Sequence, residues 1–180
     1  MVDVDKIKRD LDKYFTIDGS IKIDPSTGVV DVDGDVTLMK SISLLPVKFG
    51  TVSGKFVCRY RELTSLEGSP HYVGGEFNCY TNQLTSLEGS PRYVGGYFYC
   101  SGNPLTSFQG APDHVGGEFV CAYNESLPLL RLVVYQRAYM LKVPPKVEEI
   151  IRKYEGEGKP GALKAAAELI RAGYKENARW

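Results

Sequence analysis

The sequence predicts an α+β fold, in which a β-solenoid of short parallel strands in 21-residue coils carries an N-terminal capping helix and a C-terminal helical unit. Four cysteines recur at intervals of 21 residues, at Cys58, Cys79, Cys100 and Cys121. Around them the phrases LTSLEGSPHYVGGEFNCYTNQ and LTSLEGSPRYVGGYFYCSGNP are nearly identical. A fixed short period indicates one structural unit stacked on copies of itself.

Residues 1–15 are expected to form a helix that caps one end of the sheet. Apolar residues recur at helical spacing among charged neighbours, at Val4, Ile7, Leu11 and Phe15. This pattern is typical of an amphipathic helix. A helix in that place would cover a sheet edge that otherwise invites pairing with another chain.

Residues 16–126 are assigned to the solenoid, and residues 16–51 form its degenerate part. The segments around Gly19 and Gly34 resemble the segment around Gly54, which opens the first regular coil. The gaps between these glycines are 15 and 20 residues, not 21. Two interpretations stay open, because residues 16–51 can form either irregular coils or hairpin strands that extend the same sheet.

Residues 52–126 carry the regular coils. Phenylalanine and cysteine alternate with other residues, as at Phe77 and Cys79, which predicts a short strand with one buried face. Equivalent positions of adjacent strands lie about 4.8 Å apart, so the four cysteines are expected to form a column of buried thiols. Zinc ribbons instead use closely spaced cysteine pairs. We therefore predict a structural ladder, without metal or other cofactor, and keep a metal or redox role as the alternative.

Three asparagines, Asn82, Asn103 and Asn124, occur at one fixed place in the coils, where each strand is expected to end. An amide side chain both donates and accepts hydrogen bonds. It can therefore satisfy backbone groups of adjacent coils that a tight turn leaves without partners. We expect these asparagines to belong to the same structural ladder as the cysteines.

The unit F-x-C-x-x-N-x-L-T-S-L resembles the leucine-rich repeat L-x-x-L-x-L-x-x-N-x-L, with phenylalanine and cysteine at two leucine positions. Its period and its LTSL segment are similar to the short bacterial class found in secreted effector proteins. The variant LTSLEGSPxxVGGxFxCxxN also resembles repeats of uncharacterised proteins of tailed bacteriophages. The resemblance covers residues 52–126, although Gly74 and its equivalents replace the first leucine and Arg61 replaces the first asparagine. It implies protein recognition and, for a phage protein, a role in the host cytoplasm against a host defence protein.

Residues 127–180 are expected to form an all-helical unit. The apolar stretch Leu129–Met140 is the first part, and Pro144-Pro145 is expected to begin the next helix. That helix has on one face Val147, Ile150, Ile151 and Tyr154. The last helix, Ala162–Ala172, has on one face Leu163, Ala166, Ala167 and Ile170. This unit is long for a cap alone, which favours a second contact with a partner.

The strand positions that alternate with phenylalanine and cysteine are expected to point outward. They differ most among coils that are otherwise nearly identical, which favours a recognition surface centred on Tyr97 and Tyr99. The alternative is that tyrosine occurs there only because it is a good strand former. The predicted partner-binding residues are Arg59, Glu76, Asn78, Tyr80, Tyr97, Tyr99 and Glu118.

Charge and composition narrow the classes of partner. Lys and Arg total 22, and Asp and Glu also total 22, so a protein that binds nucleic acid through phosphate charge is not favoured. Residues 127–180 contain 11 basic and 6 acidic side chains, which gives +5, and the remainder gives −5. The sequence contains no apolar run of about 18 residues, the length that a membrane span requires. Its charged N-terminal segment does not resemble a secretory signal. A cytoplasmic location without membrane contact is expected.

The expected function is non-catalytic protein recognition through the strands. The two histidines, His71 and His114, stand at non-equivalent positions two coils apart, and no nucleophile motif or close carboxylate pair stands out. The partner is expected to be a protein, in the phage interpretation one from a bacterial host. One alternative is a small-molecule or nucleotide binder at the solenoid–helix junction, with charge from Arg131, Arg137 and Lys159. The other is a self-assembling protein that forms homo-oligomers through the strands or the helical tail.

Overall fold

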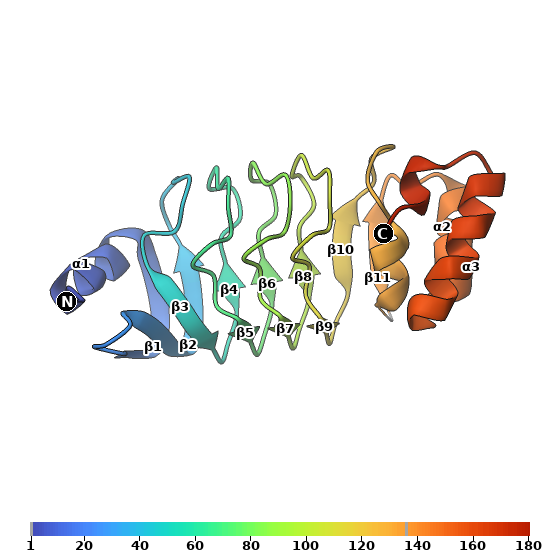
Figure 1. Cartoon of the computed structure of the whole chain (residues 1–180). Coiled ribbons are helices and arrows are strands. Elements are labelled where there is room, and N and C mark those ends of the chain that lie inside the picture. Colours follow the sequence, from blue (N-terminus) through green and yellow to red (C-terminus); the bar gives the residue numbers. More distant parts are fainter. Residues whose placement is uncertain (1, 136) are drawn as a thin grey trace.

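The repeats fold as coils, each with two very short strands that stack on the equivalent strands of neighbouring coils. The computed structural model describes residues 2–135 and 137–180 and shows an elongated β-solenoid of about five turns (Figure 1). Helix α1 (Val4–Tyr14) lies at one end, and α2 (Pro145–Tyr154) and α3 (Gly158–Arg171) lie at the other. The predicted α+β solenoid with helices at both ends is confirmed.

Two ladders of parallel strands run along the molecule and are joined by the long strand β2 (Val29–Leu38), which pairs with both β3 and β4. The first ladder contains β4 (Phe56–Val57), β6 (Phe77–Asn78), β8 (Phe98–Tyr99), β10 (Phe119–Ala122) and β11 (Ala138–Leu141). The second contains β3 (Lys48–Val52), β5 (Tyr72–Val73), β7 (Tyr93–Val94) and β9 (His114–Val115).

The N-terminal end of the sheet is a hairpin and not a pair of coils. Strand β1 (Phe15–Ile23) pairs antiparallel with β2, from Phe15 opposite Leu38 to Ile23 opposite Val30. Gly19 lies directly opposite Gly34, and a side chain on either would collide with the backbone of the other strand. This close approach explains the glycines that resemble Gly54 in sequence. Of the two interpretations of residues 16–51, the structure has the hairpin.

A continuous column of aromatic rings fills the core. The four repeat phenylalanines stack nearly parallel, with ring centroids 5.0 to 5.7 Å apart, in the order Phe56, Phe77, Phe98 and Phe119. Phe15 and Phe49 extend the column at one end through edge-to-face contacts. Tyr135 closes it at the other end, 4.6 Å from Phe119, and donates its hydroxyl to the carbonyl of Pro112. The rings thus link both ends of the solenoid.

The four cysteines lie beside this column and are completely buried. Two of them donate a hydrogen bond to a carbonyl of the next coil, Cys79 to Tyr99 and Cys100 to Val120. Burial raises the pKa of the Cys58 and Cys121 thiols to about 12 and raises those of Cys79 and Cys100 as well. A protonated buried thiol is a poor nucleophile and a poor metal ligand.

The repeat asparagines join adjacent coils. Asn82 accepts from the backbone N–H groups of Arg61 and Leu63 and donates to the carbonyls of Cys58 and Cys79. Asn103 makes the equivalent donations one coil later, to Cys79 and Cys100. Asn124 departs from the pattern, because it donates to Leu105 only.

At the C-terminal end of the array, Asn177 has the role that the repeat asparagines have between coils. It belongs to the 3-10 helix η2 (Glu176–Ala178) and is buried. Its amide donates to the carbonyls of Asn124, Glu125 and Leu127 and accepts from the hydroxyl of Tyr123. The C-terminal segment therefore satisfies backbone groups that a further coil would otherwise satisfy.

The stretch Leu129–Met140, expected to be helical, is not an α-helix. It contains the 3-10 helix η1 (Leu130–Val134) and most of β11 (Ala138–Leu141). β11 pairs in parallel with β10, so that Ala138 and Met140 take the inward places opposite Phe119 and Cys121. The solenoid thus extends one strand further than the repeat letters indicate.

Helices α2 and α3 pack as a pair on that end of the solenoid (Figure 1). The predicted stripe of α2 is buried: Val147, Ile150, Ile151 and Tyr154. The predicted face of α3 is wrong, because Leu163 is 74% exposed and Ile170 is also exposed. The buried residues of α3 are Gly161, Ala162, Ala165 and Leu169. None of the helices in the described ranges has the length and apolar character that a membrane span requires.

Candidate functional site

The outward side chains of β4, β6, β8, β10 and β11 form one surface, which we call the strand face. The register places five of them in a row across the strands, in the order Val57, Asn78, Tyr99, Val120 and Tyr139. The rows on either side contain the residues immediately before and after each Phe-x-Cys pair. This face is therefore a grid whose spacing is fixed by the sheet, about 4.8 Å from one coil to the next.

An exposed pair of tyrosines occupies the middle of the strand face. Tyr97 is 43% exposed, and its ring stacks on that of Tyr99 with centroids 5.7 Å apart and an interplanar angle of 11°. Tyr99 belongs to β8 and Tyr97 immediately precedes this strand in the same coil, so the pair is not produced by repetition between coils. Phe98, which lies between them in sequence, is completely buried. The alternation of a strand thus separates the core ring from the two surface rings.

A hollow of about 440 Å³ adjoins this pair at Tyr99 and extends across the strand face from Arg59 to Leu141. It is bordered by two further tyrosines, Tyr60 and Tyr80, whose rings meet edge to face at 5.3 Å. Other side chains that line it are those of Arg59, Glu76, Tyr99 and Leu141. The strand face therefore combines aromatic rings, a concave region and separate charged groups, a composition that is common at protein interfaces.

Two glutamates give the centre of the strand face its charge. The pKa of Tyr99 is raised, first by partial burial of its hydroxyl and then by the negative charges of Glu76 and Glu118 and by Tyr97. Glu76 accepts a hydrogen bond of 2.8 Å from the amide of Asn78. Among the described residues, neither Glu76 nor Glu118 forms an ion pair, although eleven pairs occur elsewhere.

Three side chains expected to be exposed on the strand face are buried. Asn78 is 8% exposed and Ser101 is 2% exposed, and Val120 is also buried. The larger neighbouring side chains cover them. Asn78, predicted to contact a partner, instead donates to Glu76 and accepts from the backbone N–H of Tyr80. Its role in the structure is to position these two neighbours.

Three exposed residues of this region were not predicted. Tyr60 precedes the first repeat phrase, and Tyr139 and Leu141 lie on β11. The signal for the last two is the alternation of Ala138 and Met140 with Tyr139 and Leu141, 19 residues after Phe119 and Cys121. The remaining predicted residues, Arg59, Glu76, Tyr80, Tyr97, Tyr99 and Glu118, all lie on this side of the first ladder.

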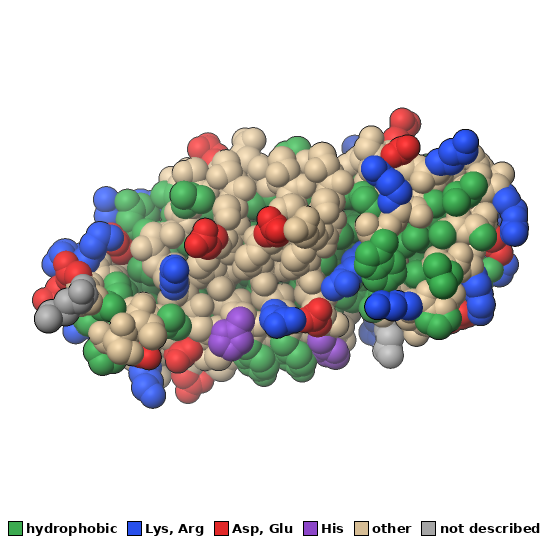
Figure 2. All heavy atoms as spheres, viewed as in Figure 1, with side chains coloured by type: hydrophobic (Ala, Val, Ile, Leu, Met, Phe, Trp, Pro, Cys, Tyr) green, Lys and Arg blue, Asp and Glu red, His purple; other side chains and the backbone are tan. Residues whose placement is uncertain are grey.

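A second aromatic column runs along the edge of the other ladder. Tyr72 stacks on Tyr93 at 5.0 Å, and Tyr93 stacks on His114 at 4.7 Å. These three residues, the edge column, occupy equivalent positions in successive coils. Figure 2 shows both histidines of the chain along this edge, with a basic and an acidic side chain between them. Tyr93 is stacked on both sides, so both faces of its ring are occupied, whereas Tyr72 and His114 each have one stacked face.

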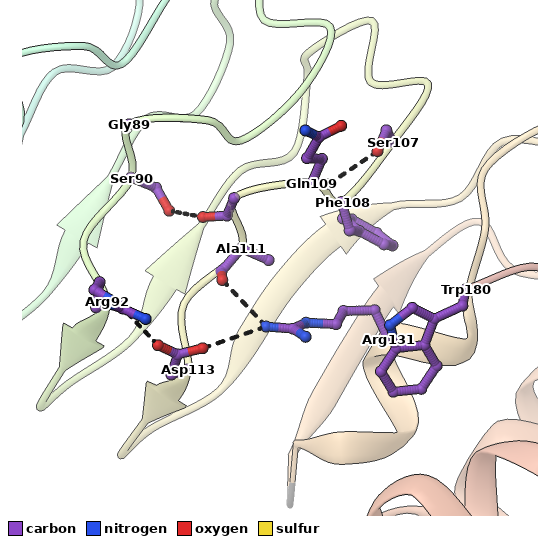
Figure 3. Close-up of a pocket in the computed structure, with 11 residues that line it drawn as sticks. Gly89, Ser90, Arg92, Ser107, Phe108, Gln109, Ala111, Asp113, Arg131 and Trp180 are labelled. Carbon is purple, nitrogen blue, oxygen red and sulfur yellow. Dashed lines mark hydrogen bonds and ion pairs between the residues drawn. The ribbon is translucent and has the colours of Figure 1, made fainter.

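A second hollow, of about 580 Å³, lies at the junction of the solenoid with the C-terminal segment (Figure 3). Asp113 pairs there with Arg92 at 3.1 Å and with Arg131 at 3.6 Å. The Nε atom of Arg131 is buried without a hydrogen-bond partner among the described residues. Trp180 lies beside Arg131 in this hollow. Of the three basic residues expected at the junction, Arg131 lines the hollow, Lys159 lines an adjoining one, and Arg137 lines neither.

Three glycines with the spacing G-x-G-x-x-G, Gly156, Gly158 and Gly161, lie in the loop after α2 and in the first turn of α3. Gly156 donates its N–H to the carbonyl of Val133 and has a φ of 78°. A side chain on Gly161 would collide with Glu157 and with the carbonyl of Tyr154. Helix α2, and not a strand, precedes them, so the arrangement is not that of a dinucleotide-binding loop.

The described residues contain no group of three histidine, cysteine, aspartate or glutamate side chains that could hold a metal ion. Comparison of the chain with protein-family models, with curated proteins and with solved structures finds no match.

Proposed function

We propose that this protein is a non-catalytic recognition module that binds a protein partner through the strand face. The observation that carries the proposal is the stacked pair of Tyr97, which is exposed, and Tyr99, which is half-buried, at the centre of a sheet whose opposite side is the core. Exposed aromatic rings held in one orientation lose little conformational entropy on binding, and for this reason tyrosine is frequent at interface hot spots.

The distribution of sequence variation supports this proposal. Inward positions keep the same letters from coil to coil, as Phe77, Phe98 and Phe119 do. Outward positions change, since Glu76, Tyr97 and Glu118 occupy one place in three coils. The fold requires the residues at the inward positions and tolerates changes at the outward positions. The outward positions are therefore available for specificity. In the setting that the repeat resemblance suggests, the partner is a protein of a bacterial host, met in its cytoplasm.

A pull-down from bacterial host lysate tests the proposal when three forms of the protein are compared. The variant Tyr97→Ala/Tyr99→Ala removes the central pair, and Tyr72→Ala/Tyr93→Ala removes the same number of exposed rings from the edge column. We expect a specific partner to be lost with the first variant and kept with the second, while circular dichroism shows both folded. A partner kept by the first variant, or no specific partner at all, would contradict the proposal.

A second candidate function is the binding of a small anionic ligand, such as a nucleotide, in the junction hollow. The observation that favours it is the unpartnered Nε of Arg131 beside the exposed ring of Trp180 (Figure 3). An arginine can bind a phosphate or carboxylate, and an indole can stack on a base. Calorimetry with a panel of nucleotides tests it, and heat that is unchanged in Arg131→Gln would contradict it.

A further inference from the structure

The charge on the strand face defines the chemistry of the side chain that it fits. We propose that the partner presents a basic side chain, lysine or arginine, which lies on the Tyr97–Tyr99 pair between the carboxylates of Glu76 and Glu118. This proposal rests on the proposed function and adds to it the class of segment that is bound.

The first support is geometric. Glu76, Tyr97 and Glu118 occupy the same place in three successive coils, so the two carboxylates flank the tyrosine within one row. Their backbones are two strand spacings apart, about 9.6 Å. Backbones this far apart place one glutamate on each side of Tyr97 instead of side by side as a pair that shares a proton, and one cationic group can lie over the tyrosine between them.

The second support is electrostatic. Both glutamates are half-buried, and within the described part of the chain neither has a basic partner. The charged groups that act on the Tyr99 hydroxyl are these two glutamates, and both raise its pKa. Two partly desolvated negative charges that lack a counterion are a favourable site for a cation, which would regain there much of the solvation it loses.

The third support is the orientation of the rings. A cation within about 6 Å of a tyrosine ring face is attracted by the ring quadrupole. The nearly parallel Tyr97 and Tyr99 rings each have one face turned away from the other ring, and the aliphatic stem of lysine or arginine can pack on such a face. The edge column lacks this combination, because its central ring, Tyr93, is stacked on both sides and its neighbouring charges, Arg92 and Asp113, form an ion pair.

The other basic residues of the strand face do not neutralise this site. Lys55 pairs with Asp35 at 3.4 Å. Arg137 is the neighbour of Glu118 in the same row and Arg59 lies on the first regular coil, but both side chains are exposed and no ion pair joins them to either glutamate. The local charge at the centre therefore stays negative although the outer part of the face is basic. A second copy of this chain could also offer lysines and arginines, since residues 127–180 carry a surplus of five, so self-association is one of the outcomes of the test.

Panning a random dodecapeptide display library on the immobilised full chain tests the proposal without a known partner. We expect the enriched peptides to share a lysine or arginine. A synthetic peptide from this set should bind Glu76→Gln/Glu118→Gln at least about tenfold more weakly, as the loss of about 1.4 kcal/mol would give. Glutamine keeps an acceptor oxygen for Asn78, so the fold is retained. The matched control is Glu67→Gln/Glu88→Gln, which removes two charges from turns of the same solenoid, away from the strand face.

The outcomes separate this proposal from the function on which it rests. The cation site is overturned if the enriched peptides lack a basic residue. It is also overturned if they bind Glu76→Gln/Glu118→Gln as tightly as they bind the control Glu67→Gln/Glu88→Gln. If such peptides no longer bind Tyr97→Ala/Tyr99→Ala, the proposed recognition function stands without the cation site. Peptides insensitive to the tyrosine variant, or no enrichment, overturn both. Light scattering that shows a dimer dissociated by Glu76→Gln/Glu118→Gln would assign the site to a second copy and overturn the proposal of a separate partner.

Discussion

The edge column and the strand face both expose aromatic rings, but they arise in different ways. Tyr72, Tyr93 and His114 stack because they hold the same place in successive coils, which the sheet brings to about 5 Å from one another. Tyr97 and Tyr99 stack within one coil, at positions that hold other residues in the adjacent coils. Repetition accounts for the first set and does not account for the second.

This difference separates what the fold needs from what it leaves free. The buried phenylalanines, cysteines and asparagines are repeated because each coil must present the same surface to the next. A position that changes between otherwise identical coils is under no such requirement. The strand face therefore is the part of the solenoid on which specificity can be built without loss of the stack.

The largest effect is expected from the buried aromatic column. Phe98→Ala removes a ring that stacks on Phe77 and on Phe119 and should lower the free energy of unfolding by about 3–5 kcal/mol, as loss of a buried phenylalanine does elsewhere. Denaturant unfolding followed by circular dichroism measures the loss. A change below about 1 kcal/mol would contradict the role of this column, because such a value is typical of surface sites.

A smaller loss is expected from the asparagine ladder. Asn82→Ala leaves four buried backbone groups without their side-chain partner and should cost about 2–3 kcal/mol. Asn124→Ala is the matched change at the end of the array, where the amide makes two hydrogen bonds, donating to the carbonyl of Leu105 and accepting from the N–H of Ser126. The same unfolding measurement should therefore show a clearly larger loss in the free energy of unfolding for Asn82→Ala than for Asn124→Ala. Equal losses would mean that the ladder does not act coil by coil.

The thiol column should make stability depend on alkaline pH. Burial raises the pKa of Cys58 and Cys121 from 9.0 to about 12, so above pH 9 the unfolded chain releases these protons while the folded chain keeps them. The free energy of unfolding should therefore be unaffected by these groups below pH 9 and fall as the pH rises toward 12. Cys58→Ala/Cys121→Ala should fall less steeply. Identical slopes would indicate thiols that ionise freely in the fold.

The smallest effects compare single exposed rings. Tyr93 stacks on two neighbours, whereas Tyr97 stacks on one. At about 0.5–1.5 kcal/mol for each aromatic pair, Tyr93→Ala should cost about twice as much stability as Tyr97→Ala. Only the latter should weaken partner binding. The reverse order in stability would show that the strand-face tyrosines support the fold.

The regular coils could be predicted from sequence because one period fixes strands, core positions and register together. Phe77, Cys79 and their equivalents are buried as expected. The stretch Leu129–Met140 could not be assigned in the same way, since a continuous apolar run has no periodicity that distinguishes a strand from a helix. Its pairing with β10 depends on contacts that only the folded chain makes.

Other features depend on packing between distant segments. Asn177 lies 53 residues from Asn124 and is not at a repeat position, so no spacing connects them. In α3, small residues recur on more than one side, and the buried side is chosen by the close approach of α2 at Gly161. On the strand face, alternation gave the direction of Asn78 and Ser101 correctly, but their burial follows from the size of the side chains around them.

A saturation substitution scan of residues 52–126, read as the amount of folded protein, tests the central claim most directly. Repeated inward positions, such as Phe98 and Asn82, should tolerate almost no substitution. Tyr97, Glu76 and Glu118 should accept most polar residues without loss of folded protein, because the coils do not need them. Tolerance at Phe98, or intolerance at Tyr97 equal to that at Phe98, would contradict the separation of fold and recognition between the two faces of the strands.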